Sequence, residues 1–250
     1  MSKGGRARDR ANARRVVEQQ QAAERRRRVT MWTSAVVVLV LVVAGLVGWR
    51  VLAGQQKSAA TALTTPPGVV DSSTAWSVGS GPVVVDVYED FMCPVCRNFE
   101  SASGATIKQL VTDKKITVRY HTVAILDASS SGTQYSTRSA GAAAAAAIDG
   151  KFIEYHDVLY ANQPQEGSTG LTNAKLIDLG KSVGLTSTAF VDAINNKTYD
   201  AWVAKVTDTF SSRGYNGTPT IVVAGKLLQG PNQTVPTTAE FTQAVTQAAG

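Results

Sequence analysis

The sequence predicts an α/β domain preceded by a single N-terminal transmembrane helix. Three observations carry this prediction. Residues 31–49 contain no charged side chain, residues 83–88 are valine-rich and are soon followed by two cysteines, and strand-like and helix-like patterns alternate beyond them. About 175 residues follow the polar stretch after the apolar run, which is enough for one domain with a proper hydrophobic core.

The apolar run over residues 31–49 is long enough to cross a bilayer core at about 1.5 Å per residue. Residues 1–30 hold ten basic and three acidic side chains, a net charge of +7, whereas the 14 basic and 16 acidic side chains after Arg50 give −2. Because positive charge beside a span stays cytoplasmic, we expect a cytoplasmic basic tail over 1–30, a single-pass helix over 31–49 and an extracytoplasmic C-terminal domain. A cleavable signal peptide ending near Ala53 is the alternative, although the apolar run and the region before it are long for one.

Residues 50–74 are rich in Gln, Ser, Thr and Ala and contain Pro66-Pro67-Gly68, so they are interpreted as a flexible linker. The domain is then expected over 75–250. Since this part carries no basic excess and the tail has no interleaved aromatic residues, nucleic-acid binding is not expected. The basic tail is instead suited to anionic lipid at the inner membrane surface.

The only two cysteines of the chain, Cys93 and Cys96, are separated by Pro94 and Val95. A cysteine between a strand and the start of a helix lies at the positive end of the helix dipole, which favours its thiolate. At this spacing the two Cα atoms lie about 5–6 Å apart, which suits a disulfide that opens without moving the backbone. Pro94 fits the first helical turn, where its missing N–H has no partner. Cys93 and Cys96 are therefore the predicted catalytic pair, which alternates between a dithiol and a Cys93–Cys96 disulfide.

A structural disulfide and a zinc site are two other possible uses of the cysteines, and both fit the sequence less well. A structural disulfide across so short a loop would remove little entropy from the unfolded chain. A zinc site needs about four ligands, and His121 and His156 stand apart without ligand spacing. No metal is expected, and no cofactor either, because the chain has no glycine-rich nucleotide loop.

The remaining elements follow in order along the domain. Strands are predicted over 83–88 and 116–121, with a helix over 94–111 between them. An alanine block at 142–147 favours a helix, and the helical pattern then recurs over 152–161, 173–183, 188–194 and 199–210. A strand over 219–223, a turn at 224–225, a partner strand from 227 and a last helix over 238–248 complete the domain. A central sheet with helices on both faces satisfies this order. The core candidates are Trp76, Trp202, Tyr160 and Phe210.

Two motifs carry a family resemblance: Glu89-Asp90-Phe91-Met92-Cys93-Pro94-Val95-Cys96 and, far downstream, Gly217-Thr218-Pro219-Thr220. Together they resemble the thioredoxin superfamily and, within it, the DsbA-like thiol:disulfide oxidoreductases of bacterial cell envelopes. The resemblance covers residues 75–250. It implies a thioredoxin-like fold with a helical insertion at about 133–195, because a minimal core needs only roughly 45 residues between the two motifs.

The resemblance also implies roles for the residues around the cysteines. Thr218–Pro219 would be a cis peptide facing the cysteines, with the Thr218 backbone aligning a substrate segment beside Cys93; an ordinary trans turn is the alternative. Strongly oxidising relatives often carry His at the position of Val95, so a milder oxidant is expected here.

Many relatives have a buried acid six residues before the first cysteine, where this chain has Val87. Strand alternation places Val85, Val87 and Glu89 on one face. Glu89 is the candidate proton acceptor for Cys96, and a solvated carboxylate at the strand end is the other interpretation. His156 is expected to be a partly buried helix residue that is hydrogen-bonded to a neighbour.

The function implied by the resemblance is the introduction of disulfides into exported, cysteine-containing proteins. A quinone-linked membrane oxidase of the VKOR or DsbB type would then recycle the site. Two alternatives remain open at this point. One is an envelope reductase or isomerase of the same fold, and the other is a thioredoxin-like binding module whose cysteines matter little.

Overall fold

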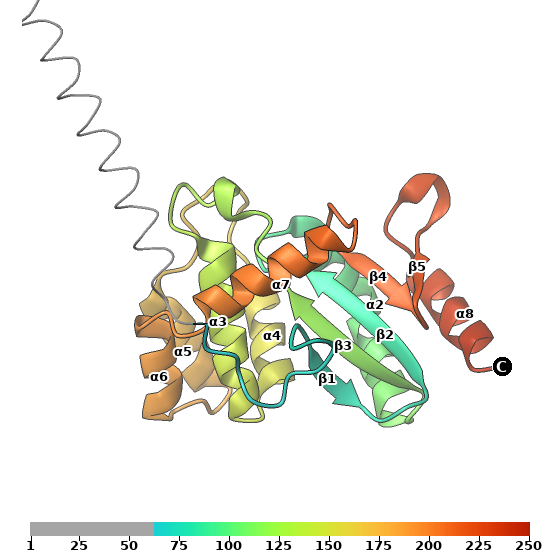
Figure 1. Cartoon of the computed structure of the whole chain (residues 1–250), viewed down its shortest axis with the longest axis horizontal. Coiled ribbons are helices and arrows are strands. Elements are labelled where there is room, and N and C mark those ends of the chain that lie inside the picture. The colour runs from blue at the N-terminus through green and yellow to red at the C-terminus, as the bar shows by residue number, and fades with distance from the viewer. Residues whose placement is uncertain (1–62) are drawn as a thin grey trace, which may run out of the picture. The chain divides into compact units, whose positions relative to one another are not determined.

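A computed structural model describes residues 63–250, which contain one five-stranded mixed sheet with the strand order β1-β3-β2-β4-β5 (Figure 1). The strands are β1 (Trp76–Gly79), β2 (Val83–Glu89), β3 (Ile116–Thr122), β4 (Thr220–Val223) and β5 (Lys226–Leu228). β2 and β3 are parallel, and every other neighbouring pair is antiparallel. The predicted tail, transmembrane helix and most of the linker lie outside the described residues. Within the part that is described, no helix combines the length and apolar character needed to cross a membrane.

Seven α-helices surround the sheet within the described range. They are α2 (Pro94–Thr112), α3 (Tyr135–Ile148), α4 (Phe152–Ala161), α5 (Asn173–Ser182), α6 (Thr188–Asn195), α7 (Asp200–Ser212) and α8 (Thr238–Ala248), with short 3₁₀ turns at Asp127–Ser129 and Pro231–Gln233. Helices α3 to α6 gather at one end of the sheet, whereas α7 and α2 lie on opposite faces of it (Figure 1). The predicted sheet with helices on both faces is therefore confirmed.

The two faces of β2 and β3 pack against different helices because side chains alternate along a strand. On one face, the Tyr88 ring lies 5.4 Å from the ring of Phe210 in α7. On the other, the Tyr120 ring lies 5.3 Å from that of Phe152 in α4. Each face of the central strands is thus closed by aromatic side chains of a different helix.

The alanine block lies in α3, where the side chains of 142–146 are buried. Small side chains let neighbouring helices approach closely, and α3 packs against α4, α6 and α7. The predicted core positions Trp76, Trp202, Tyr160 and Phe210 are all buried.

One strand is absent from the predicted order of elements. β1 pairs antiparallel with β3, from Trp76 opposite Tyr120 to Gly79 opposite Thr117. It has only four residues, WSVG, and directly follows the stretch interpreted as linker, so it offers too short a pattern to recognise. Its place in the sheet depends on Trp76, whose ring lies 6.3 Å from that of Trp202 in α7.

Candidate active site

The two cysteines lie at the start of α2, a few residues after the end of β2. Cys93 is the N-cap residue of α2, with extended backbone angles (φ −74°, ψ 115°), and Pro94 occupies the first turn. The Cys93 amide donates to the Asp90 carbonyl at 2.9 Å. Cys96 lies one turn further, on the buried face of the helix, whereas the side chain of Val95 is exposed beside the pair. The local geometry is the strand–cysteine–helix arrangement that the sequence predicts.

The two thiols differ in acidity. A hydrogen bond with the Cys96 thiol is the main factor that lowers the pKa of Cys93 to about 6, although burial of the thiol opposes this shift. Contacts with Thr218 and the backbone amides of Val95 and Cys96 lower this pKa further. Burial, together with the neighbouring charge of Cys93, raises the pKa of Cys96 well above its usual value. At neutral pH, Cys93 is therefore a thiolate and Cys96 a thiol. These protonation states suit a nucleophilic and a resolving cysteine, respectively.

The second motif lies against the first, although the chain separates them by 125 residues. β4 runs antiparallel to β2, with Thr220 opposite Tyr88, and this pairing brings residues 217–219 to the cysteines. The Thr218–Pro219 peptide is cis, so the alternative of a trans turn is wrong. When Cys93 is protonated, its Sγ donates to the Thr218 carbonyl at 3.4 Å.

Glu89 is buried with 1% of its surface exposed, so its interpretation as a solvated carboxylate is wrong. Its Oε1 lies 2.9 Å from His156 Nε2, and its Oε2 accepts a hydrogen bond from the Tyr160 hydroxyl at 3.2 Å. His156 is also more buried than expected, and the ring–carboxylate pair joins β2 to α4. Val87, at the position where many relatives carry an acid, is fully buried on the same strand face.

A second carboxylate, that of the partly buried Glu100 of α2, completes this cluster. Burial raises the pKa of Glu100 to about 7, and its Oε1 has no hydrogen-bond partner among the described residues. Burial would lower the pKa of His156, but the charge of Glu89 and hydrogen bonds to Asp157 and Glu89 outweigh it and raise the pKa to about 10. A cavity of about 380 Å³ between α2 and α4 is lined by Glu100, His156 and Tyr160. The cluster is thus a charged group within the core that borders a cavity.

Asp90 supports the turn that precedes Cys93. It is fully buried; its Oδ1 accepts from the Met92 amide at 2.8 Å and its Oδ2 from the Leu126 amide at 2.9 Å. Burial raises the pKa of Asp90 to about 7. These bonds tie the cysteine turn to the segment that follows β3.

Glu100 and the roles of Asp90, His156 and Tyr160 are not among the features predicted from the sequence. A signal existed for Glu100, because it stands four residues after Cys96 and therefore lies near the same side of the helix. The other roles depend on contacts between β2 and α4, which no local pattern reveals. Tertiary packing also places each histidine beside two carboxylates: Glu89, Glu100 and His156 form one group, and Asp71, Asp86 and His121 form another on different elements.

Comparison with known proteins agrees with this geometry. The family model described as Thioredoxin matches residues 78–245, and the chain belongs to this family. The reduced disulfide bond oxidoreductase DsbG from Mycobacterium tuberculosis is 29% identical, with a TM-score of 0.62, over 75% of this chain and 93% of that one. Oxidised DsbA from M. tuberculosis is 31% identical, with a TM-score of 0.60, over 70% of this chain and 93% of that one. Fold and similarity together define a DsbA-like thiol:disulfide oxidoreductase.

A longer relative shares only part of its length with this chain. The serine/threonine-protein kinase PknE of M. tuberculosis is 34% identical over 120 residues, which is 45% of this chain and 21% of the kinase. The chain therefore spans about one fifth of that relative, and the match concerns one region of it.

Proposed function

We propose that the Cys93-Pro94-Val95-Cys96 site introduces disulfides into exported proteins. The observation that carries this proposal is the opposite shift of the two thiol pKa values, lowered to about 6 in Cys93 and raised in Cys96. A stabilised Cys93 thiolate favours the reduced form of the site, and a stable reduced form makes the disulfide form an oxidant. The uncharged side chain of Val95 adds nothing to that stabilisation, which is consistent with a milder oxidant.

The reaction proceeds in two exchanges. A substrate thiolate attacks Cys93 Sγ of the Cys93–Cys96 disulfide, the S–S bond breaks, and Cys96 leaves and is protonated. A second substrate thiolate then attacks the substrate sulfur of the mixed disulfide and releases the Cys93 thiolate. Two electrons pass from the substrate to the enzyme, and the substrate gains one disulfide. The Thr218 carbonyl, within 3.4 Å of Cys93 Sγ, lies where the backbone of an extended substrate would pass.

The cellular setting belongs to the same proposal. The apolar run over 31–49 and the net charge of +7 over 1–30 support a single-pass membrane protein with a cytoplasmic N-terminus. The domain would then act outside the cytoplasm, where disulfides persist. A quinone-linked membrane oxidase of the VKOR or DsbB type would return the dithiol to the disulfide.

Trapping in cells tests the proposal with the full chain. Cys96→Ser leaves Cys93 able to form mixed disulfides but removes the resolving thiol, so adducts accumulate. We expect exported proteins with several cysteines among them, identified by mass spectrometry after acid quenching. The matched control is the Cys93→Ser/Cys96→Ser double variant, which forms none. Adducts restricted to cytosolic proteins, or a wild-type site that rests mainly as dithiol in cells, would contradict the proposed oxidase role.

A further inference from the structure

The carboxylates of Glu89 and Glu100 and the imidazole of His156 form a group that the two exchanges do not use. We propose that these three side chains bind one zinc ion, with water from the adjoining cavity as the fourth ligand. The inference goes beyond thiol–disulfide exchange and does not depend on it, so its failure would leave the proposed function standing.

The three donors come from three elements and lie close together. Glu89 of β2, Glu100 of α2 and His156 of α4 each offer one ligand atom, and these atoms lie within 4.8 Å of one another. The Oε1 atom of Glu89 and the Nε2 atom of His156 are 2.9 Å apart. Zinc bonds of about 2.0–2.2 Å to nitrogen and oxygen place the donors of a tetrahedral ion roughly 3.4 Å apart. Small rotations of the Glu100 side chain would therefore bring all three donors to a single ion.

Buried atoms of the same three side chains lack good hydrogen-bond partners. Glu89 Oε1, Glu100 Oε1 and His156 Nε2 are inaccessible to solvent, and none makes a well-aligned hydrogen bond with any residue in the range 63–250. Such atoms are the exception in folded proteins, because a buried polar atom without a partner loses the interactions that water would give it. One bound cation would satisfy all three atoms at once.

Neighbouring side chains orient the donors in the way that the outer shell of a metal site does. The Tyr160 hydroxyl donates to Glu89 Oε2 at 3.2 Å, which leaves Oε1 beside His156. On the imidazole, Nδ1 lies 3.5 Å from Asp157 Oδ1, so Nε2 is the nitrogen available to a metal. A carboxylate on the second nitrogen of a ligating histidine is a usual outer-shell partner.

The charges of this group also leave a place for a cation. Among residues 63–250, neither Glu89 nor Glu100 forms an ion pair with a lysine or arginine, and His156 can balance only one of the two carboxylates. In the other histidine–carboxylate group, by contrast, the Arg213 guanidinium lies 2.7 Å from Asp71. A metal ion therefore suits the first group and not the second.

The donor set and the cavity favour zinc over calcium or magnesium. Those two ions prefer oxygen ligands, whereas an imidazole suits zinc, and three protein ligands with one water complete a tetrahedral site. Glu100 and His156 line the cavity of about 380 Å³, which has room for that water and gives the ion a route of entry. Zinc coordinates only an unprotonated Nε2, so binding releases a proton from a cationic His156 to solvent.

The test is zinc binding by the full chain, purified in detergent without a polyhistidine tag and stripped of metal with a chelator. The Cys93→Ser/Cys96→Ser variant is the background, because cysteine thiolates bind zinc themselves. Calorimetric titration with zinc chloride should give one ion per chain. The oxidised wild type, whose disulfide occupies both sulfurs, should bind zinc with the same affinity.

Glu100→Gln in this background removes one donor at the cavity wall. It should weaken zinc binding by at least about a hundredfold, since loss of a ligand is more severe than loss of an outer-shell partner. When free zinc exceeds the dissociation constant of the background about a hundredfold, the melting temperature of the background should rise by about 5–11 °C. The same zinc concentration should leave the melting temperature of Glu100→Gln unchanged.

The controls separate this site from other zinc ligands. Glu154→Gln removes an exposed carboxylate of α4 that pairs with Lys151, and Asp86→Asn removes a donor of the His121 group; both should leave zinc affinity unchanged. X-ray absorption of the zinc-loaded background needs no further substitution and should show an imidazole ligand. Absence of binding, unchanged affinity in a folded Glu100→Gln, a loss of affinity in Asp86→Asn or a spectrum without imidazole would each overturn the proposal.

Discussion

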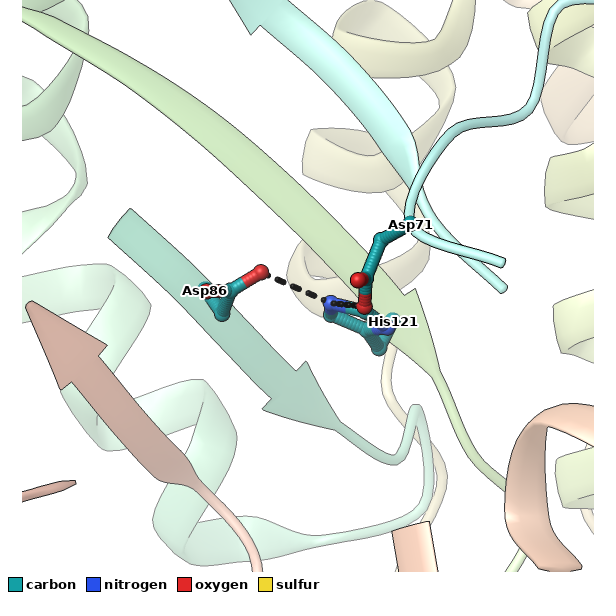
Figure 2. A group of neighbouring side chains, drawn as sticks. All are labelled: Asp71, Asp86 and His121. Atoms are coloured by element: carbon teal, nitrogen blue, oxygen red, sulfur yellow. Dashed lines mark hydrogen bonds and ion pairs between the residues drawn. The ribbon is translucent and has the colours of Figure 1, made fainter. Parts of the chain in front are cut away.

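The two buried histidines lie on opposite faces of the sheet, and each has two carboxylates beside it. His156 meets Glu89 and Glu100 behind the cysteines, whereas His121 meets Asp86 at 3.1 Å and Asp71 at 3.7 Å (Figure 2). Their surroundings differ. We call the first group the Glu89 cluster and the second, with its arginines, the Asp71 cluster.

Permanent cations neutralise the Asp71 cluster. Arg213 Nη1 lies 2.7 Å from Asp71 Oδ2, and Arg119 lies within 3.9 Å of both Asp71 and Asp86. The His121 ring also stacks on Tyr88, with ring centroids 4.1 Å apart. Burial opposes ionisation of Asp71, but the hydrogen bond and charge of Arg213 outweigh it and lower the pKa. The same residue types therefore build a fixed ion-pair network on one face and a titrating group on the other.

The largest difference between the two clusters should be in how much each contributes to the unfolding free energy. His156→Ala leaves the Glu89 carboxylate buried without its cation, and we expect a loss of about 3–5 kcal/mol of unfolding free energy. Arg119→Ala removes a guanidinium that is 32% exposed and should cost only about 0–1 kcal/mol. Urea denaturation of both variants at neutral pH measures the contrast. Equal losses would mean that the two clusters are equivalent supports.

The sequence predicted the elements whose patterns are local. The last helix has the predicted bounds, 238–248, and the helix predicted over 94–111 is one residue longer. The first predicted strand, 83–88, is also one residue longer in the structure and ends at Glu89, which breaks the apolar pattern. That residue is nonetheless in the strand and buried, since His156 and Tyr160 of α4 compensate its charge and hydrogen-bonding needs.

The Asp71 cluster also depends on contacts distant in sequence, and it was even harder to predict from local patterns. Asp71 lies in a stretch that its composition assigns to a linker. It is ordered by contacts distant in sequence: Trp202 Nε1 donates to the Ser73 carbonyl at 2.8 Å, and Lys205 Nζ to that of Ser72 at 3.1 Å. Such contacts form only once α7 has packed on the sheet, so composition alone could not reveal them.

The pH dependence of stability should have opposite signs in the two clusters. The pKa of Glu100 is raised from 4.5 to about 7, so the native state binds more protons than the unfolded state in this window. The stability that Glu100 contributes is present below pH 4.5 and is lost as the pH rises to about 7. The change is about 3 kcal/mol, and Glu100→Gln should remove it. Unfolding titrations of the wild type and this variant across the window measure the difference.

For Asp71 the sign is reversed. The pKa of Asp71 is lowered in the native state, so its contribution to stability is present above the usual pKa of 3.8 and is lost as the pH falls through the native pKa. Asp71→Asn should therefore differ most from the wild type at neutral pH and converge with it in acid. If the unfolding free energy of Glu100→Gln changes with pH in parallel to that of the wild type between pH 4.5 and 7, Glu100 does not titrate in this window. The proposed difference between the two clusters would then be wrong.

A small effect is expected for Arg213→Gln, which tests whether the Asp71 cluster acts only as a support. Arg213 joins Asp71 to the hydroxyl of the buried Tyr88, and the side chains of Arg213 and Asp71 are both partly exposed, so the loss should be about 1 kcal/mol. Hydrogen exchange should accelerate in residues 70–75, which lose their link to the sheet. The face of β2 that carries Tyr88 packs against α7. The Glu89 cluster lies on the other face, beside α2 and α4. Alkylation kinetics should therefore return an unchanged Cys93 pKa of about 6, and a clear shift would show that the arginine network also reaches the thiols.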